Sequence, residues 1–235
     1  MSITTSDIKE NNMLQKDIKQ VVGSLVSELD FYFENKGFKR RKNGFVYTRK
    51  INTTVQKIDM VFFSNPSYYQ NVLAHIYPHM QILFPGVNDT AKIFANHLIP
   101  EKWLNKFTIR QPVQIYSNSK KICLKDVNNY MCLKEEILTF FEEHTMPLLE
   151  ELTCEKDYLA LYEKKDKRII WDDNQSLYIA SAYVNNHKLK EANQVIEKRF
   201  GKPGMRKQYK EVFDFLENIE CSQGDKRGKT YDELR

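Results

Sequence analysis

Residues 37–51, with the sequence GFKRRKNGFVYTRKI, constrain the fold of this chain more than any other stretch. Gly37 follows a helical pattern and stands where a helix ends, because a residue without a Cβ adopts the left-handed conformation at little cost. Asn43-Gly44 tolerates the positive φ angles of a type I′ hairpin turn. We therefore expect a helix, a strand over residues 38–42, a two-residue turn and a second strand over residues 45–51.

The residues on either side extend this pattern. Apolar side chains recur at spacings of three and four between residues 13 and 36, which predicts an amphipathic helix. Residues 52–54 predict a turn, and residues 55–64 predict a third, better buried strand. Residues 75–84 predict a fourth strand, in which Pro78 requires an edge or a bulge because it has no N–H to donate.

The second half of the chain has helical spacing throughout. Residues 127–152 predict a helix with a break at Pro147, and further helices are expected over residues 154–165, 175–186, 188–200 and 205–219. Strands gathered in one half and helices in the other are typical of an α+β protein. We expect three parts: residues 1–126 as a helix with an antiparallel sheet of about four to five strands, residues 127–220 as a helical region packed on or beside it, and residues 221–235 as a mobile tail.

The composition is that of a folded protein without a membrane span. Aromatic residues make up 12% of the 235 residues, which supplies core volume and argues against disorder. No apolar run approaches the roughly 20 residues that cross a bilayer, and residues 1–19 lack the apolar segment of a secretory signal. The four cysteines show no Cys-x-x-Cys spacing, so we expect reduced thiols in a cytoplasmic protein.

Charge is distributed unevenly along the chain. The net charge is +5, but residues 1–125 contain 18 Lys and Arg against nine Asp and Glu, whereas residues 126–235 contain 18 against 22. A basic first half attracts nucleic acid, acidic lipid headgroups or an acidic protein, and an acidic second half can hold a basic partner.

The predicted hairpin carries the densest positive charge. Its candidate binding residues are Lys39, Arg40, Arg41, Lys42 and Arg49. Phe38, Phe45 and Tyr47 interleave with them, and cations beside aromatic platforms suit single-stranded nucleic acid. The alternative is an exposed hairpin whose charges keep an edge strand from pairing with other chains.

Paired glutamates mark a second candidate surface on the predicted helix over residues 127–152. The pairs at 135–136, 142–143 and 150–151 return to nearly the same helical face. Glu135, Glu142 and Glu143 are the residues that we expect to meet a basic partner. The alternative is a solvated face, since no neighbouring pattern sets one carboxylate apart for acid–base work.

The chain carries no recognised catalytic motif. No Gly-x-Ser-x-Gly sequence, Walker motif or cysteine nucleophile motif is present. His75 and His79 would share one face of a strand at roughly 13 Å, too far apart to share a metal ion. We therefore predict no catalytic residue, no metal and no cofactor, and leave open an enzyme with an unrecognised site around His75, Tyr77 and His79.

The helical region contains one pattern that is typical of helical repeats. Residues 178–183 and 190–192 resemble a helical hairpin of the tetratricopeptide kind, with small alanines that permit close helix contact. Solenoids of such hairpins need about three repeats, and one is visible here. A helical cap on the sheet is therefore favoured over a peptide-binding array.

The start of the chain resembles an uncharacterised bacterial family, the domain of unknown function 4304. The residues that carry the resemblance are 35–39, the basic pair after them, and 43–49, with residues 58–63 fitting the next element. The family has no established activity, so the resemblance implies no catalytic residue. Small α+β proteins of this sort occur beside bacterial toxins as immunity proteins, and that relation is an analogy.

These observations favour a non-catalytic protein-binding module, for example an inhibitor or immunity protein of a bacterial toxin. The first alternative is a nucleic-acid-binding protein that uses residues 39–50. The second is an enzyme with an unrecognised site. We expect a protein partner, with nucleic acid as the alternative partner and no membrane.

Overall fold

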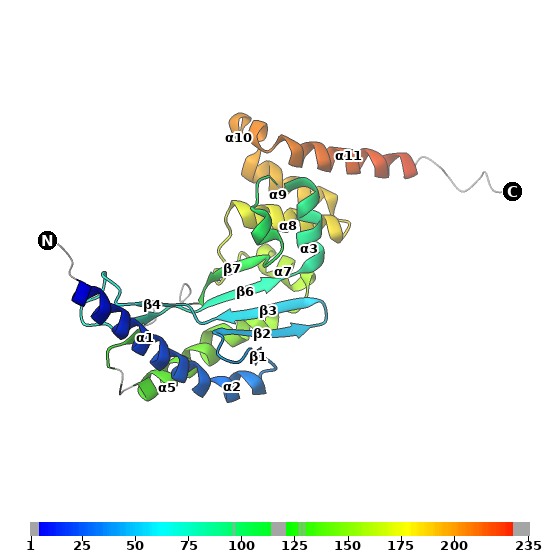
Figure 1. The fold of residues 1–235 in the computed structure, drawn as a ribbon. Coiled ribbons are helices and arrows are strands. Elements are labelled where there is room, and N and C mark those ends of the chain that lie inside the picture. The colour runs from blue at the N-terminus through cyan, green and yellow to red at the C-terminus, as the bar shows by residue number, and fades with distance from the viewer. Residues whose placement is uncertain (1–4, 96, 114–120, 127, 129, 228–235) are drawn as a thin grey trace. The chain divides into compact units, whose positions relative to one another are not determined.

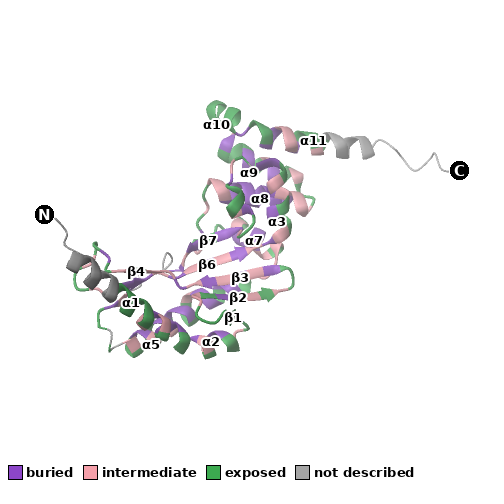
Figure 2. Ribbon diagram, viewed as in Figure 1, coloured by how far each residue is buried: buried purple, intermediate pink, exposed green. Residues whose placement is uncertain are grey.

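The computed structural model of the chain describes residues 5–95, 97–113, 121–126, 128 and 130–227. Its elements confirm the α+β class: helices begin the chain, antiparallel strands follow, and a helical region ends it (Figure 1). Buried residues lie along the strands and on one side of most helices (Figure 2). Both kinds of element therefore contribute to the hydrophobic core.

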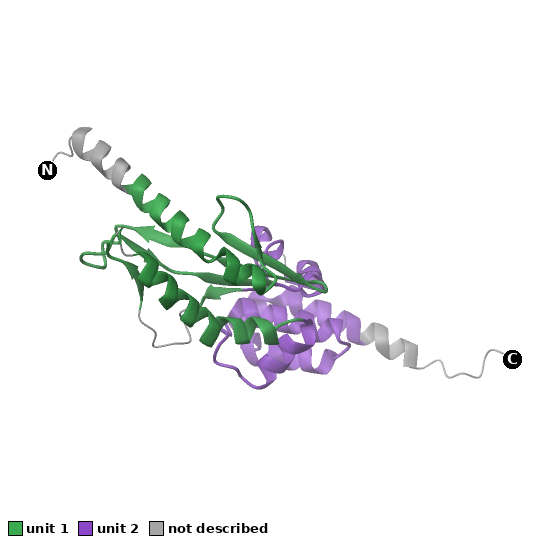
Figure 3. Ribbon diagram, turned by 90° about the horizontal axis from the view of Figure 1, so that it is seen from below, with its two compact units in different colours: residues 1–82, 110–153 green, residues 83–109, 154–235 purple. Residues whose placement is uncertain are grey.

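The chain folds into two compact units (Figure 3). Unit 1 comprises residues 1–82 and 110–153, and unit 2 comprises residues 83–109 and 154–235. This division differs from the boundary that the sequence suggested at residue 126. Hydrophobic periodicity reports the type of a local element, but it does not report which distant segments pack together.

Unit 1 begins with the predicted N-terminal helix, which is present as α1 (Thr5–Glu28) and α2 (Asp30–Asn35). Gly37 ends it with a φ of 81°, as its lack of a Cβ predicted. One stripe of these helices is fully buried: Ile18, Val22, Leu25, Leu29 and Phe33. The spacings of three and four in that stripe are what bring α1 and α2 onto the sheet.

The larger sheet has five strands in the order β1-β2-β3-β6-β7. Its strands are β1 (Lys39–Arg40), β2 (Val46–Ile51), β3 (Thr54–Asp59), β6 (His79–Leu83) and β7 (Ile109–Pro112). Strands β1, β2 and β3 pair antiparallel, with Arg40 opposite Tyr47 and Ile51 opposite Thr54. β1 is an edge strand of this sheet.

The prediction of a type I′ turn at Asn43-Gly44 is wrong. Asn43 has a φ of 59°, but Gly44 is not in the left-handed region, and Gly44 N–H bonds to the Arg41 carbonyl at 2.9 Å. A type I′ turn requires positive φ at both central residues. The two-residue hairpin loop lies instead at Asn52-Thr53, where Asn52 has a φ of 52°.

Two predicted strands are each divided between two sheets, namely residues 55–64, expected as one strand, and residues 75–84, expected as a strand with an edge or bulge at Pro78. Residues 55–64 form part of β3 and then β4 (Phe62–Ser64), and residues 74–83 form β5 (Ala74–Ile76) and β6. The smaller sheet has the order β4-β5-β8, with β8 at Ile122–Leu124. Pro78 explains the division, because it lies between β5 and β6 and has no N–H for the ladder. On the partner strand, Val61 N–H bonds to the Asp59 carbonyl at 2.9 Å and bends the chain at the same level.

The predicted helix over residues 127–152 is interrupted before Pro147. It comprises α5 (Tyr130–Phe140), a π-helical turn (Phe141–Thr145) and α6 (Met146–Glu151). A proline ring clashes with the carbonyl four residues earlier, and a wider π turn relieves that clash. Helices α1 and α5 lie across one side of the strands of unit 1 (Figures 1 and 3).

Unit 2 is mainly helical. Its helices are α3 (Pro85–Ala95), α4 (Glu101–Leu104), α7 (Glu155–Glu163), α8 (Asp173–Asn185), α9 (Leu189–Phe200), α10 (Pro203–Gln208) and α11 (Lys210–Arg227). Helix α8 packs between α3 and α9, and its alanines are buried there. Residues 221–227, which the sequence placed in a mobile tail, continue α11, because a helix once formed extends at little cost per residue. Residues 228–235 of that expected tail lie outside the described residues.

Candidate functional site

The base of the hairpin is fastened to α2 by Arg40. Its Nε lies 2.7 Å from Asp30 Oδ1, its Nη2 lies 2.5 Å from Asp30 Oδ2, and its Nη1 donates to the Gly44 carbonyl at 2.8 Å. The Arg40 side chain is only 10% exposed. The hydrogen bond from Arg40 is the largest influence on the pKa of Asp30, which is lowered despite partial burial. Arg40 is therefore a structural residue of the hairpin and not a free cation.

Arg49 is also held within unit 1. Its Nε donates to Gln56 Oε1 at 2.7 Å, its Nη1 donates to the Lys36 carbonyl at 3.0 Å, and its guanidinium lies 4.5 Å from the centroid of the Phe38 ring. Burial lowers the pKa of Arg49 from its ordinary value. The sequence placed Arg49 among the binding residues, and the structure brings it beneath the sheet surface instead.

The expectation that aromatic platforms interleave with the hairpin cations is wrong for Phe38 and Tyr47. Both side chains are fully buried. Phe38 contacts the ring of Phe33, and the Tyr47 hydroxyl lies 2.5 Å from the Val26 carbonyl. Phe45 is half-buried against Phe62. Phe38 and Tyr47 therefore offer no free face for a base, whereas Phe45 lines both hollows described below.

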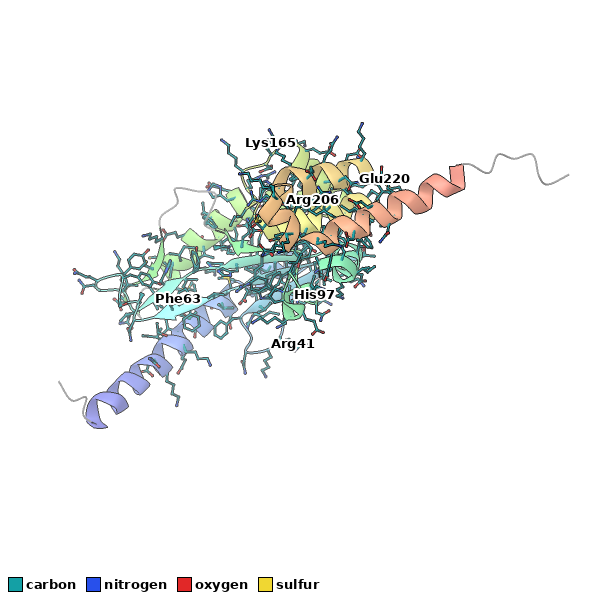
Figure 4. The ribbon with its side chains drawn as sticks, turned by 90° about the horizontal axis from the view of Figure 1, so that it is seen from above. Arg41, Phe63, His97, Lys165, Arg206 and Glu220 are labelled. Atoms are coloured by element: carbon teal, nitrogen blue, oxygen red, sulfur yellow. The ribbon has the colours of Figure 1, made fainter. Side chains whose placement is uncertain are left out.

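The remaining hairpin cations surround two hollows of unit 1. One hollow of about 640 Å³ is lined by α1, by Arg40 and by the turn around Gly44. The second, of about 610 Å³, adjoins it and is lined by β1, β2 and Lys57. The exposed or half-exposed cations at these hollows and on the turn between them are Lys16, Lys19, Lys39, Arg41, Lys42 and Lys57, and we call this set the basic surface. Arg41 projects outward from the ribbon (Figure 4).

The basic surface has little neutralising charge. None of its six members forms an ion pair within the part of the chain that the structure describes. Glu28 lines the first hollow, but its Oε2 is 3.2 Å from Lys134 Nζ. The charges of the basic surface are therefore available to a partner.

Two members of the basic surface were not predicted from the sequence. Lys16 and Lys19 lie on α1, more than a helical turn away from any other predicted site residue in the sequence. Their polar positions on an amphipathic helix indicated exposure but not a neighbour. Only the folded chain brings them to the hollow that Arg40 and Gly44 of the hairpin also line.

The structure separates the three predicted acidic residues. Glu142 binds within unit 1, where it accepts hydrogen bonds from the Tyr32 hydroxyl and from Lys36 Nζ, the latter at 3.1 Å. The hydrogen bond from Tyr32 is the main reason that the pKa of Glu142 is lowered. Glu135 and Glu143 are exposed and line a hollow of about 390 Å³ beside Ile122. Glu142 is thus largely satisfied by α2, whereas Glu135 and Glu143 remain accessible.

The histidines of the suggested unrecognised site lie on either side of Tyr77, His75 on β5 and His79 on β6. His75 Nδ1 is 3.2 Å from the Tyr68 hydroxyl, and the ring of Tyr77 lies between His75 and His79, at 5.4 Å and 5.3 Å. Burial lowers the pKa of both imidazoles, and the charges of Lys121 and Arg110 act in the same direction. Among the described residues, no group of three or more His, Cys, Asp or Glu could hold a metal ion.

Comparison with known proteins adds no relative to this picture. No family model matches the chain, and neither a curated protein nor a solved structure is significantly similar to it. The resemblance to the domain of unknown function 4304 stays a prediction. Across the described ranges, no helix has the length and apolar character needed to cross a bilayer.

Proposed function

We propose that this chain is a non-catalytic protein-binding module and that its basic surface docks an acidic partner protein. The observation that carries the proposal is the gathering around two adjoining hollows of six cations that form no ion pair with any described residue. Charge of one sign in a concave surface attracts an oppositely charged partner and accelerates its association.

The scaffold beneath the basic surface supports this proposal. The Arg40–Asp30 ion pair and the buried Tyr47 hold the hairpin against α1 and α2. A binding surface that is fixed before the partner arrives loses less conformational entropy on association. The burial of Phe38 and Tyr47 also favours protein over nucleic acid here, because it leaves Phe45 alone of the three hairpin aromatics for a base to stack on.

An inhibitor of a bacterial toxin, such as an immunity protein, is the form of this function that we propose. The residues that resemble the domain of unknown function 4304 include Lys39 and lie next to Arg41 and Lys42, so the resemblance and the basic surface coincide. The link from that resemblance to immunity proteins is by analogy.

The test is a comparison of three immobilised proteins. The wild type is compared with a triple variant of the basic surface, Lys39→Glu, Arg41→Glu and Lys42→Glu, and with a control of equal charge change in unit 2, Lys164→Glu, Lys165→Glu and Lys167→Glu. All six positions are exposed, so neither variant should disturb the core. Each is incubated with lysate of the native cell, once untreated and once after nuclease treatment.

We expect an acidic protein to remain on the wild type and on the control, to be absent from the basic-surface variant, and to elute as salt is raised. The purified protein should then bind the wild type at least about tenfold more tightly than it binds the variant. Proteins retained equally by the two variants would refute docking on the basic surface. Loss of the bound protein on nuclease treatment alone would refute a direct protein contact.

A further inference from the structure

The smaller sheet of unit 1 has one apolar face and one ring-bearing face. Phe63 on β4 lies opposite His75 on β5, and His75 lies opposite Cys123 on β8. Residues directly opposite each other in an antiparallel ladder share a face. The alternate positions on β5 and β8, namely Ala74, Ile76, Ile122 and Leu124, are buried on the other face.

The connection between β4 and β5 adds rings to this face. Asn65 and Asn71 adopt positive φ angles of 45° and 56° near its two ends, which turns the chain back over the strands. Tyr69 then lies 5.2 Å from the His75 ring, and Tyr68 lies 6.0 Å from it. We call Phe63, Tyr68, Tyr69, His75 and Tyr77 the aromatic face.

Three rings of the aromatic face lie side by side. Phe63, His75 and Tyr77 have centroids 5.4 to 6.5 Å apart, with interplanar angles of 34° to 44°. These angles are far from the perpendicular arrangement in which one ring covers another with its edge. Phe63 and Tyr77 therefore flank His75, while Tyr68 and Tyr69 cover the His75 ring edge-on, at interplanar angles of 82° and 80°.

The aromatic face is open to solvent. Phe63 is 46% exposed and Tyr68 is 58% exposed, which is unusual for large apolar or aromatic side chains. His75 is only 7% exposed, and its Nε2 is buried without a hydrogen-bond partner. Figure 4 labels Phe63 on β4, well apart from Arg41 of the basic surface.

Positive charge borders the aromatic face. Lys121 Nζ lies 4.6 Å from the centroid of the Tyr69 ring. Burial raises the pKa of the Cys123 thiol, and the nearby charges of Lys125 and Lys121 oppose that rise. The charge of Glu136 has the opposite effect and raises the pKa of the same thiol. Residues 60–88 and 102–125, which supply every member of the face, contain no Asp or Glu. A negatively charged ligand would therefore meet no carboxylate from the strands or their connection.

We propose that the aromatic face binds single-stranded nucleic acid, with bases stacked on the accessible rings of Phe63, Tyr68 and Tyr77 and phosphates near Lys121. Exposed ring faces beside lysines are the combination that holds unpaired bases with little sequence preference. Sugars and cationic ligands fit less well, because both favour carboxylates near the rings and the face offers lysines instead. This inference concerns a surface separate from the basic surface and does not rest on the proposed function.

The test is fluorescence anisotropy with labelled oligo(dT) and oligo(U) at low and at physiological salt. Phe63→Leu keeps the apolar volume and removes the ring, whereas Phe63→Tyr keeps the ring. Phe31→Leu is the control, because Phe31 is 76% exposed on α2, outside the aromatic face. Thermal melting followed by circular dichroism verifies that each variant is folded.

We expect the wild type to bind either oligonucleotide, Phe63→Leu to weaken the affinity about tenfold, and Phe63→Tyr and Phe31→Leu to leave it within about twofold of the wild type. Lys121→Gln should lower the slope of log Kd against log salt by about one. The absence of binding at low salt would overturn the proposal and leave a protein partner for this face. Binding that Phe63→Leu retains would also overturn it, as would binding lost only on charge reversal of Lys39, Arg41 and Lys42.

Discussion

Arg40 and Asp30 form a two-point ion pair, with Nε 2.7 Å from Oδ1 and Nη2 2.5 Å from Oδ2. The hydroxyl of the buried Tyr47 lies 2.8 Å from the same Oδ1. The contact joins β1 and β2 to α2, on which Asp30 is the first residue. The basic residues in the most basic stretch of the chain thus have two different roles. Some hold the hairpin in place, and the others face solvent.

The first prediction separates these two kinds of residue. Arg40→Gln should lower the free energy of unfolding by about 1–3 kcal/mol, because it leaves Asp30 and the Gly44 carbonyl without their donor. Lys42→Gln should change it by less than about 0.5 kcal/mol, since Lys42 is exposed. Urea denaturation followed by circular dichroism measures both. Equal effects of the two substitutions would contradict a structural role for Arg40.

The second prediction concerns acid. The folded chain lowers the pKa of Asp30, chiefly through the hydrogen bond from Arg40. A carboxyl group with a lowered pKa in the folded state stabilises the fold above its unfolded pKa, and the stabilisation is lost as the pH falls through the folded pKa. The difference in unfolding free energy between the wild type and Asp30→Asn should therefore be largest near neutral pH and should shrink in acid. Denaturation curves from about pH 6 to about pH 2 measure it, and a difference that does not change with pH would contradict the assignment.

The fold could be predicted where the signal was local. Gly37 ended a helix as expected, because the requirement for positive φ is a property of one position. The division of residues 55–64 between two sheets could not be predicted, since β3 and β4 together have the composition of one continuous strand. What divides them is Pro78, which lies between β5 and β6. Strand β5 pairs with β4 and β6 pairs with β3, and these pairings join residues that are distant in the sequence.

The candidate site was predictable in its charge and not in its arrangement. Sequence alone identified Lys39, Arg41 and Lys42 as exposed, and it grouped Arg40 and Arg49 with them because all carry the same charge. Their burial follows from Asp30 and Gln56, partners at separations of ten and seven residues that no periodic pattern indicates. Sequence alone singled out His75 and Tyr77 of the aromatic face but not Phe63, Tyr68 and Tyr69, because those three rings come from β4 and from the connection between β4 and β5.

The third prediction tests the polar network in the core of unit 2. Phe84 N–H donates to Thr108 Oγ1 at 2.9 Å, the Thr108 hydroxyl donates to Asn88 Oδ1 at 2.5 Å, and Asn88 Nδ2 donates to the Leu104 carbonyl at 2.8 Å. Asn88→Ala leaves these buried groups without their hydrogen-bond partner and should lower the free energy of unfolding by about 1–3 kcal/mol. Thr108→Val should cost a similar amount, and the double variant should cost less than the sum, because the two side chains share one network.

The matched control for this network is Asp89→Ala. Asp89 neighbours Asn88 on α3 but is exposed, and its ion pair with Lys92 is a surface pair of small effect. Chemical denaturation of the wild type, the three network variants and Asp89→Ala measures the five free energies. Strict additivity of Asn88→Ala and Thr108→Val would show that the hydrogen bond between them contributes nothing to stability.

The last prediction concerns His79 and the pH dependence of stability. Both ring nitrogens of His79 are buried, and neither has a hydrogen-bond partner among the residues that the structure describes. Burial lowers the pKa of His79, and the nearby charge of Arg110 lowers it further. A histidine with a lowered pKa in the folded state binds its proton more tightly in the unfolded chain. The contribution of neutral His79 to the free energy of unfolding is therefore fully present above the ordinary histidine pKa of 6.5, and it is lost as the pH drops below that value.

His79→Phe keeps a ring against Tyr77 and removes this titration. Each such group contributes at most about 1.4 kcal/mol per pH unit to the slope of unfolding free energy against pH. The variant should therefore show a shallower slope than the wild type just below the ordinary histidine pKa, whereas His187→Asn, at an exposed position, should leave the slope unchanged. His75 still contributes its own slope in all three proteins, because burial lowers its pKa as well. Equal slopes for His79→Phe and the wild type would mean that the His79 ring is solvated or paired in the folded protein, contrary to its burial between Tyr77 and the charge of Arg110.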